Sequence, residues 1–355
     1  MMTDESERYS IRPLGMFRLF LAFLVMLQHL GINLLPPELA MFNIILQPGT
    51  IGVVAFLFLS AFIILDVATS SYDGHPVRFI ANRALRILPE FLIAMIVAVL
   101  VQYYLFRHGN PANTYFYPDF PEAFSPGNIL TNLIFLIPLP QGPRWDFVYT
   151  IWTVRYEIAF YIAVFVVLAA VNRVPPASRT TLVERTMLGG AGAVVALAML
   201  APLEGTWKFM ATVYSFIAVG AIYYVLRENR TLGKQPEALS YGIVIAALTY
   251  LLLGYTNSVL TTSVTLLMVI IAMGLLELRI SDRKFARLDH LCGDLSYTVF
   301  LLHLQVATLV KNFMGATVTS FIVATVLSFA GSLVVSRLVR RVTGPLRARI
   351  RGRAI

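Results

Sequence analysis

The sequence predicts an all-α membrane protein, a polytopic helical bundle with about ten transmembrane helices. Of its 355 residues, 58% are hydrophobic and 13% are charged, whereas soluble domains average about 25% charged residues. Apolar runs long enough to cross a bilayer recur along the chain, and no polar block between them is long enough for a soluble domain. We therefore expect one membrane domain over residues 1–340, followed by a basic cytoplasmic tail over residues 341–355.

A membrane-spanning helix needs roughly 17 to 25 predominantly apolar residues. The stretches that meet this requirement are 14–35, 48–67, 88–106, 147–171, 186–203, 207–226, 239–255, 258–278, 293–312 and 317–339. A shorter apolar piece, Ile129 to Leu139, is closed by Pro138 and Pro140. Because this piece is too short to cross, it is predicted to form a re-entrant or interfacial helix.

The basic residues predict the orientation in the membrane. When successive loops are assigned alternately to the two sides, 23 of the 28 Lys and Arg residues fall on one side. Such residues gather on the cytoplasmic side, so both termini are predicted to be cytoplasmic, in the cell inner (plasma) membrane. The net charge of +9 is distributed over short loops, which argues against nucleic acid as a partner. The basic tail is expected to contact anionic membrane lipids.

The first span contains two ionisable residues, Arg18 and His29. Eleven residues separate them, which in a helix is three turns plus about 20°, so both lie on one face about 16 Å apart. In the predicted orientation Arg18 lies at the cytoplasmic end and His29 lies toward the outside. An ionisable side chain inside a bilayer is costly and is a candidate functional residue. The alternative is a structural His29 that is hydrogen-bonded to a neighbouring helix.

Two arginines, Arg83 and Arg86, precede Pro89, which we expect to open the third span. A spacing of three residues places both on one face of a helical turn. A pair of guanidinium groups suits phosphate, which arginine binds bidentately. The alternative is that both arginines only belong to the general excess of positive charge on the cytoplasmic side and bind no ligand.

The fourth span contains an acid, Glu157, about ten residues from its start. An unpaired acid at that depth costs roughly 3 kcal/mol, so we expect a partner for it. Arg155 and a protonated His29 are the two candidates, and the sequence leaves both open. A Glu–Arg pair would be structural, whereas a carboxylate beside His29 would raise the basicity of the imidazole.

The ninth span contains Ser296, Tyr297 and a second intramembrane histidine, His303. His29 and His303 are on separate spans, and no other ligand follows either at helical spacing, so no metal site is expected. Cys292 is the single cysteine, which excludes an intrachain disulfide.

In this order, these residues resemble the integral-membrane acyltransferase-3 family, which includes O-antigen, nodulation-factor and exopolysaccharide O-acetylases. Arg18 and His29 match the family's Arg-x10-His pattern, and the later pair of arginines matches its Arg-x-x-Arg. The stretch 56–62 is similar to its Phe-rich Ser-Gly-Phe element, with Ala61 in the glycine position. The acid that often precedes the family's first glycine is absent, because Pro13-Leu14-Gly15 stands there.

The resemblance continues in the fourth and ninth spans. Trp152 and Glu157 match the family's Trp-Ser-Leu…Glu…Phe-Tyr element, with Thr153 for the serine. Ser296-Tyr297 to His303 is similar to its Ser-Tyr…Tyr-Leu-x-His.

The resemblance implies a membrane-bound O-acyltransferase that uses acetyl-CoA or another acyl-CoA as donor substrate. The acceptor would be a hydroxyl of an extracytoplasmic or lipid-linked glycan. It implies His29 as general base or acyl carrier and Glu157 as the residue that orients it. Donor-binding residues would be Arg18, Arg83 and Arg86, and supporting residues would be Trp152, Ser296, Tyr297 and His303. A transporter or flippase of a lipid-linked sugar is the alternative, and a histidine-based membrane sensor is a weaker one.

Overall fold

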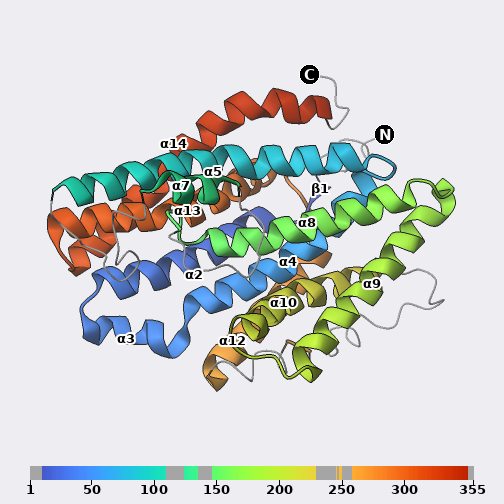
Figure 1. Ribbon diagram of the computed structural model, residues 1–355, viewed down its shortest axis with the longest axis horizontal. Helices are drawn as coiled ribbons and strands as arrows, with labels where there is room; N and C mark the ends of the chain where they lie inside the picture. The colour runs from blue at the N-terminus through green and yellow to red at the C-terminus, as the bar shows by residue number, and fades with distance from the viewer. Residues whose placement is uncertain are drawn as a thin grey trace. The chain divides into compact units, whose positions relative to one another are not determined.

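The computed structural model describes residues 10–108, 124–134, 146–228, 245, 248–249 and 258–350. Nearly all of this part is α-helical, which confirms the all-α prediction (Figure 1). Nine helical segments of the described part are long and apolar enough to span a membrane. The helices that make up these segments are α2 (Leu14–Leu34), α3 (Pro37–Leu46) with α4 (Pro48–Ser71), α5 (Pro76–Arg107), α8 (Ile151–Val171), α9 (Pro176–Leu200), α10 (Gly205–Glu228), α12 (Val259–Glu277), α13 (Arg283–Met314) and α14 (Val318–Ile350).

These segments match the predicted spans, apart from 239–255, which lies almost entirely outside the described residues. Helices α5, α13 and α14 are 32, 32 and 33 residues long, and each extends beyond its apolar core into charged sequence. Hydropathy marks only the apolar part of such a helix, so the sequence underestimated their length. The short helix α7 (Pro126–Ile134) overlaps the apolar piece predicted to be re-entrant or interfacial.

The prediction that Pro89 opens the third span is wrong, since no helix begins there: α5 begins at Pro76 and includes Pro89 in its interior. Proline removes one backbone N–H from a helix, but membrane helices tolerate this loss. Arg83 and Arg86 therefore lie within a continuous helix.

The chain divides into two compact units. Unit 1 comprises residues 1–53, 86–155 and 275–344, and unit 2 comprises residues 54–85, 156–274 and 345–355. Each is described by itself below.

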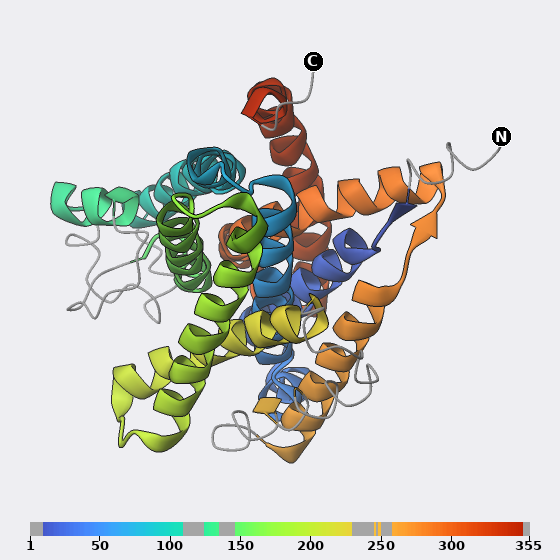
Figure 2. The same ribbon diagram turned by 90° about the vertical axis from the view of Figure 1, so that its right-hand side faces the viewer.

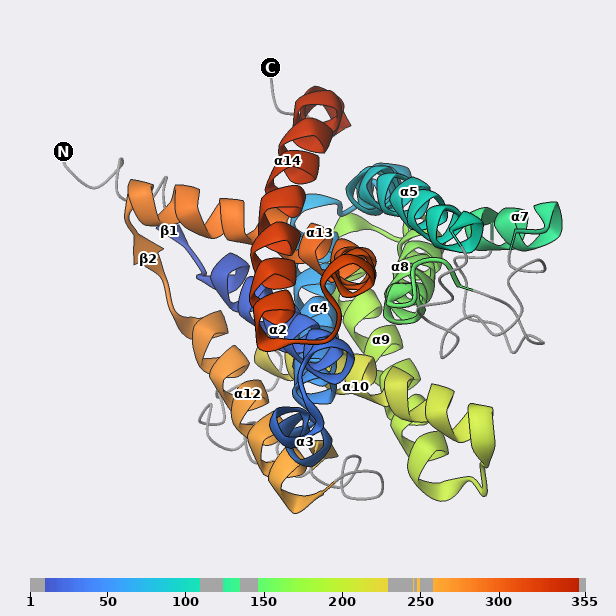
Figure 3. The same cartoon turned by 90° about the vertical axis from the view of Figure 1, so that its left-hand side faces the viewer.

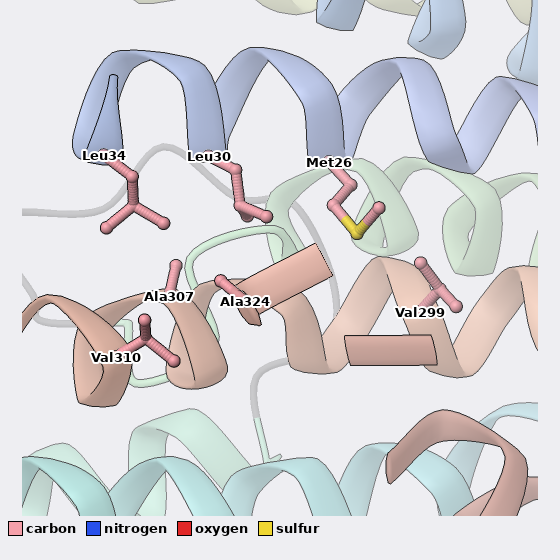
Figure 4. Close-up of a cluster of buried hydrophobic side chains, with 7 residues drawn as sticks. All are labelled: Met26, Leu30, Leu34, Val299, Ala307, Val310 and Ala324. Carbon is pink, nitrogen blue, oxygen red and sulfur yellow. The ribbon is translucent and has the colours of Figure 1, made fainter. Parts of the chain in front are cut away.

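Unit 1 is organised around the pair of helices α2 and α13. Each helix follows a two-residue strand, β1 (Ser10–Ile11) and β2 (Ile280–Ser281), and the two strands pair antiparallel (Figures 2 and 3). The helices then run in the same direction and share a buried apolar cluster, to which α14 contributes one residue. The cluster comprises Met26, Leu30, Leu34, Val299, Ala307, Val310 and Ala324 (Figure 4). In a membrane this contact is stabilised by close van der Waals packing rather than by exclusion of water.

Unit 2 contains a close crossing of α4 and α10. A methyl group added at Gly220 of α10 would lie 2.2 Å from the backbone oxygen of Phe58 and 3.0 Å from Cβ of Ala61. Small residues at such a crossing let two membrane helices approach closely. Ala61 therefore meets a glycine of the facing helix. Next to this crossing, the ring of Phe62 packs against those of Tyr223 and Tyr224.

Candidate functional site

The site begins with the register of α2 and α13. Two pairs of residues join the helices, Gly15 with Asp289 and His29 with His303, and both pairs are separated by 274 positions in the sequence. Fourteen residues therefore separate the two contacts on each helix. Fourteen residues are two heptads, the repeat with which parallel helices keep the same faces together. This register brings the two intramembrane histidines to the same level.

Asp289 fixes the beginning of α2. Its carboxylate oxygens accept the backbone N–H groups of Gly15, at 3.1 Å, and Met16, at 2.9 Å. These N–H groups have no partner within their own helix, and the helix dipole favours a negative charge there. The residues directly before Gly15 are Pro13 and Leu14, and the carboxylate that caps α2 comes from α13, a distant part of the chain. A methyl group at Gly15 would lie 1.9 Å from the backbone oxygen of Asp289, so only glycine fits.

The two histidines form a hydrogen-bonded dyad. Nδ1 of His29 lies 2.8 Å from Nε2 of His303, and the rings stack with centroids 5.1 Å apart and planes 7° from parallel. Nδ1 of His303 lies 2.9 Å from the backbone oxygen of Val299, one turn earlier in α13. His303 is completely buried, whereas His29 is partly exposed and meets the ring of Tyr149 edge-on. Of the two histidines, His29 is the one that keeps some exposed surface.

Helix α5 and the start of α8 hold α13 in place beside the dyad. The hydroxyl of Thr298 donates to Glu90 of α5 at 3.0 Å, and the hydroxyl of Thr150 donates to the backbone oxygen of Phe300 at 3.0 Å. Sequence reasoning missed Glu90, although it is a buried acid at the start of an apolar span, the signal that drew attention to Glu157.

The other two residues expected in the ninth span, Ser296 and Tyr297, bond to backbone oxygens. Tyr297, which is buried, lies with its hydroxyl 3.5 Å from the backbone oxygen of Ile87. Ser296 donates to the backbone oxygen of Gly293 within its own helix. The Tyr297 hydroxyl therefore links α13 to α5, and the Ser296 hydroxyl bonds within α13 itself.

In unit 2 the partner of Glu157 is Tyr161, whose hydroxyl donates to its carboxylate at 2.7 Å. Tyr161 also lies under Arg83, whose guanidinium carbon is 5.7 Å from the tyrosine ring and 5.6 Å from the ring of Phe79. Arg83 is buried, so its charge is stabilised partly by these aromatic faces. Arg83 and Glu157, which the sequence singled out separately, are thus connected through one tyrosine.

Arg155, one of the two partners considered for Glu157, binds Asp146 instead. Its two terminal nitrogens lie 2.8 and 2.6 Å from the two carboxylate oxygens, in a bidentate pair within unit 1. His29, the other partner considered, belongs to unit 1, whereas Glu157 belongs to unit 2.

Arg86 has different surroundings from Arg83. It lies in unit 1, close enough to Asp294 and His290 for its charge to act on both. The same carboxylate oxygen of Asp294 is 3.3 Å from Nδ1 of His290 and 3.6 Å from a terminal nitrogen of Arg340. Basic groups from α5, α13 and α14 therefore gather around one acid.

The remaining expected residues occupy the same helices. Arg18 is partly buried near the start of α2, and Trp152 is partly buried in the first turn of α8. Among the described residues, no group of three His, Cys, Asp or Glu side chains is placed to hold a metal ion.

Comparison with known proteins assigns the family. The family model described as an acyltransferase domain, that of the acyltransferase-3 family, matches residues 14–337. Searches of curated proteins and of solved structures returned no match. The matched range includes both histidines of the dyad, Glu157 and the arginines near Pro89. The chain therefore belongs to the acyltransferase-3 family, and it is a multi-pass membrane acyltransferase.

Proposed function

We propose that the protein transfers an acetyl group, or another short acyl group, from acyl-CoA to a hydroxyl of an extracytoplasmic or lipid-linked glycan. The observation that carries this proposal is the hydrogen-bonded dyad of His29, which is partly buried, and His303 on membrane helices of an acyltransferase. Imidazole suits acyl transfer because its ordinary pKa lies near neutral pH, so it can both accept and return a proton.

In the proposed reaction His29 accepts the proton of the acceptor hydroxyl while the hydroxyl oxygen attacks the thioester carbonyl. The carbon–sulfur bond then breaks, and the CoA thiolate leaves with the proton that His29 returns. Alternatively, His29 first carries the acyl group itself and then transfers it to the hydroxyl. Both routes use the same nitrogen of His29 and the same overall stoichiometry.

The donor is proposed to bind through its phosphates to Arg18, Arg83 and Arg86, from the cytoplasmic side. Arg86 supports this assignment best, because it is only partly buried and lies among further basic groups of α13 and α14. Arg83 is buried against two aromatic rings and connects to Glu157 through Tyr161, so its contribution is a positive charge held in a fixed position. Trp152, Ser296 and Tyr297 are proposed to support the site.

We propose that the protein lies in the cell inner membrane with both termini in the cytoplasm. The distribution of Lys and Arg over the loops supports it. In that orientation acyl-CoA and the basic cluster around Asp294 lie on the same side of the membrane.

The experiment that tests the function measures acyl transfer in membranes supplied with acetyl-CoA labelled on the acetyl group. Wild type is compared with His29→Ala and with a control, His108→Ala, which removes an exposed histidine whose ring contacts the backbone oxygen and the ring of Tyr104. We expect label in glycan or lipid for the wild type and the control, and none for His29→Ala. Comparable labelling in folded His29→Ala would overturn the role of His29.

The flippase alternative makes a different prediction in the same membranes. It requires movement of a lipid-linked sugar without release of CoA, and it gives the arginines no special role. The family match favours acyl transfer. Release of CoA that depends on His29 would exclude the flippase.

A further inference from the structure

The hydrogen bonds of the dyad determine where its protons lie. They form one chain, from Nδ1 of His29 to Nε2 of His303 at 2.8 Å, and from Nδ1 of His303 to the backbone oxygen of Val299 at 2.9 Å. A carbonyl oxygen only accepts hydrogen bonds, so Nδ1 of His303 carries a proton and donates it. A neutral imidazole has one N–H, so Nε2 of His303 is an acceptor. Nδ1 of His29 must therefore be the donor in the bond between the two rings.

We infer that His303 is a positioning residue that holds His29 in the Nδ1–H tautomer, with Nε2 of His29 bare and facing the reaction. This inference names the atom that would react in the proposed function. It rests on the proposed function only for the reaction of that atom, because the tautomer itself can be measured without turnover. Neutral imidazole in water favours the opposite, Nε2–H, tautomer. The dyad therefore reverses the ordinary preference of the catalytic group.

The burial of the two rings supports this assignment of roles. His303 is completely enclosed and is bonded to its own helix one turn away, so its ring cannot turn to offer a different atom. His29 is partly exposed, and its Nδ1 is already occupied by His303. Only Nε2 of His29 remains available to a substrate.

The arrangement assigns His303 the part that a carboxylate plays beside the histidine of a Ser-His-Asp triad. There the acid accepts the Nδ1–H, fixes the tautomer and orients the ring. When Nε2 of His29 accepts the hydroxyl proton, the ring becomes an imidazolium whose Nδ1–H still points to Nε2 of His303. The bond between the rings then becomes charge-assisted and stronger. The dyad thus stabilises the protonated state of His29 without a buried acid.

A purely structural role for His303 predicts something different. A residue that only packs α13 against α2 can be replaced by another of similar volume. A residue that fixes a tautomer must present an acceptor at the position of Nε2. Glutamine can present its side-chain oxygen near that position, whereas leucine fills similar space without an acceptor.

The test is 15N NMR of the full-length protein in lipid, labelled at histidine, since the bare and the protonated nitrogen of imidazole have well-separated shifts. The chain has five histidines, and the His29→Gln variant identifies the signals of His29 by difference. We expect a protonated Nδ1 and a bare Nε2 for His29 in the wild type and in His303→Gln. In His303→Leu we expect the Nε2–H tautomer. An Nε2–H tautomer of His29 in the wild type would overturn the inference, whether or not the protein transfers acyl groups.

Kinetics give a second, separate measure. Loss of the partner that orients a metal-ligating histidine costs about 10- to 100-fold in activity, and we take the same range for the partner of His29. We expect such a fall in kcat with little change in KM for His303→Leu, and partial recovery for His303→Gln. Equal activity of the Gln and Leu variants would overturn the positioning role. Absence of transfer by the wild type would instead count against the proposed function and leave the NMR result standing.

Discussion

The carboxylate of Asp289 accepts the backbone N–H of Gly15 at 3.1 Å, so the beginning of one membrane helix is capped by a residue of another helix. The same side chain also accepts the N–H of Met16. The histidine dyad lies fourteen residues further along both helices. The cap therefore fixes the register that places His29 and His303 at one level.

Replacement of Asp289 by alanine should lower the stability of the protein. Removal of a capping side chain costs about 1 kcal/mol, and here two N–H groups lose their acceptor. The measurement is the thermal unfolding midpoint in detergent. Glu38→Ala removes an exposed acid from the first turn of α3, where it loses only a favourable interaction with the helix dipole, so it should lower the midpoint less. An equal shift for both variants would contradict the capping role.

The crossing of α4 and α10 predicts that the stability of the fold depends strongly on the size of residue 220. Gly220→Leu places a side chain where the first carbon alone would lie 2.2 Å from the backbone of Phe58. Overpacking of this kind costs about 1–3 kcal/mol, and a backbone neighbour cannot move aside easily. Gly192→Leu is the matched control in α9, because nothing lies within 4 Å of a methyl group there. We expect reduced folded yield for the first variant and normal yield for the second, measured by size-exclusion chromatography.

The stabilisation of the fold by Arg155 and Asp146 is predicted to depend on their bidentate geometry. Arg155 is almost completely buried, so loss of its partner leaves an uncompensated charge, at a cost of about 3–5 kcal/mol. Asp146→Asn should therefore destabilise the fold strongly. Arg155→Lys should also be destabilising, because lysine cannot bind both oxygens. The swap Asp146→Arg with Arg155→Asp should recover part of the loss, and a swap as unstable as the worse single variant would argue against pairing.

The spans and the two histidines were predictable because each depends on local sequence. Length and hydropathy identify a span, and an ionisable residue inside one is conspicuous. Asp289 was not predictable, because it lies in charged sequence before the apolar core of α13 and acts through the register with α2. Its role exists only once the helices are packed.

The partner of Glu157 illustrates a different failure. Arg155 was considered because it is near in sequence, but residues two apart in a helix do not face each other. Tyr161 follows Glu157 by four residues and lies on the same face, as the bond between them shows. Helical spacing therefore favoured the tyrosine, whereas the expectation that a charge needs an opposite charge favoured the arginine.

Arg86 and Asp294 give opposite predictions for donor binding, as part of the proposed function. Arg86→Gln removes a cation that is proposed to bind phosphate. A charged hydrogen bond is worth about 1.5–3 kcal/mol, so the KM for acyl-CoA should rise roughly 10- to 100-fold. Asp294→Asn removes the acid that competes for Arg340 and His290, so the KM should fall. Arg78→Gln, an exposed change on the same helix, should leave the KM unchanged. A KM that rises in Asp294→Asn would contradict phosphate binding by this cluster.

The bond between Tyr161 and Glu157 can be separated from the stacking of Arg83 on the same ring. Tyr161→Phe keeps the aromatic face and removes the hydroxyl, which leaves the buried carboxylate without this donor at a cost of about 1–3 kcal/mol. Tyr161→Leu also removes the face under Arg83 and should cost a further 0.5–2 kcal/mol, roughly the range of a cation–π contact. A double-mutant cycle of Tyr161→Phe with Glu157→Leu, measured by thermal unfolding, should show a coupling energy of about 1 kcal/mol or more between the two side chains. Phenylalanine removes the donor and leucine removes the acceptor, so each single change already breaks their bond. Strict additivity in that cycle would mean that Glu157 is stabilised by something other than Tyr161, and the connection between Glu157 and Arg83 would then lose its physical basis.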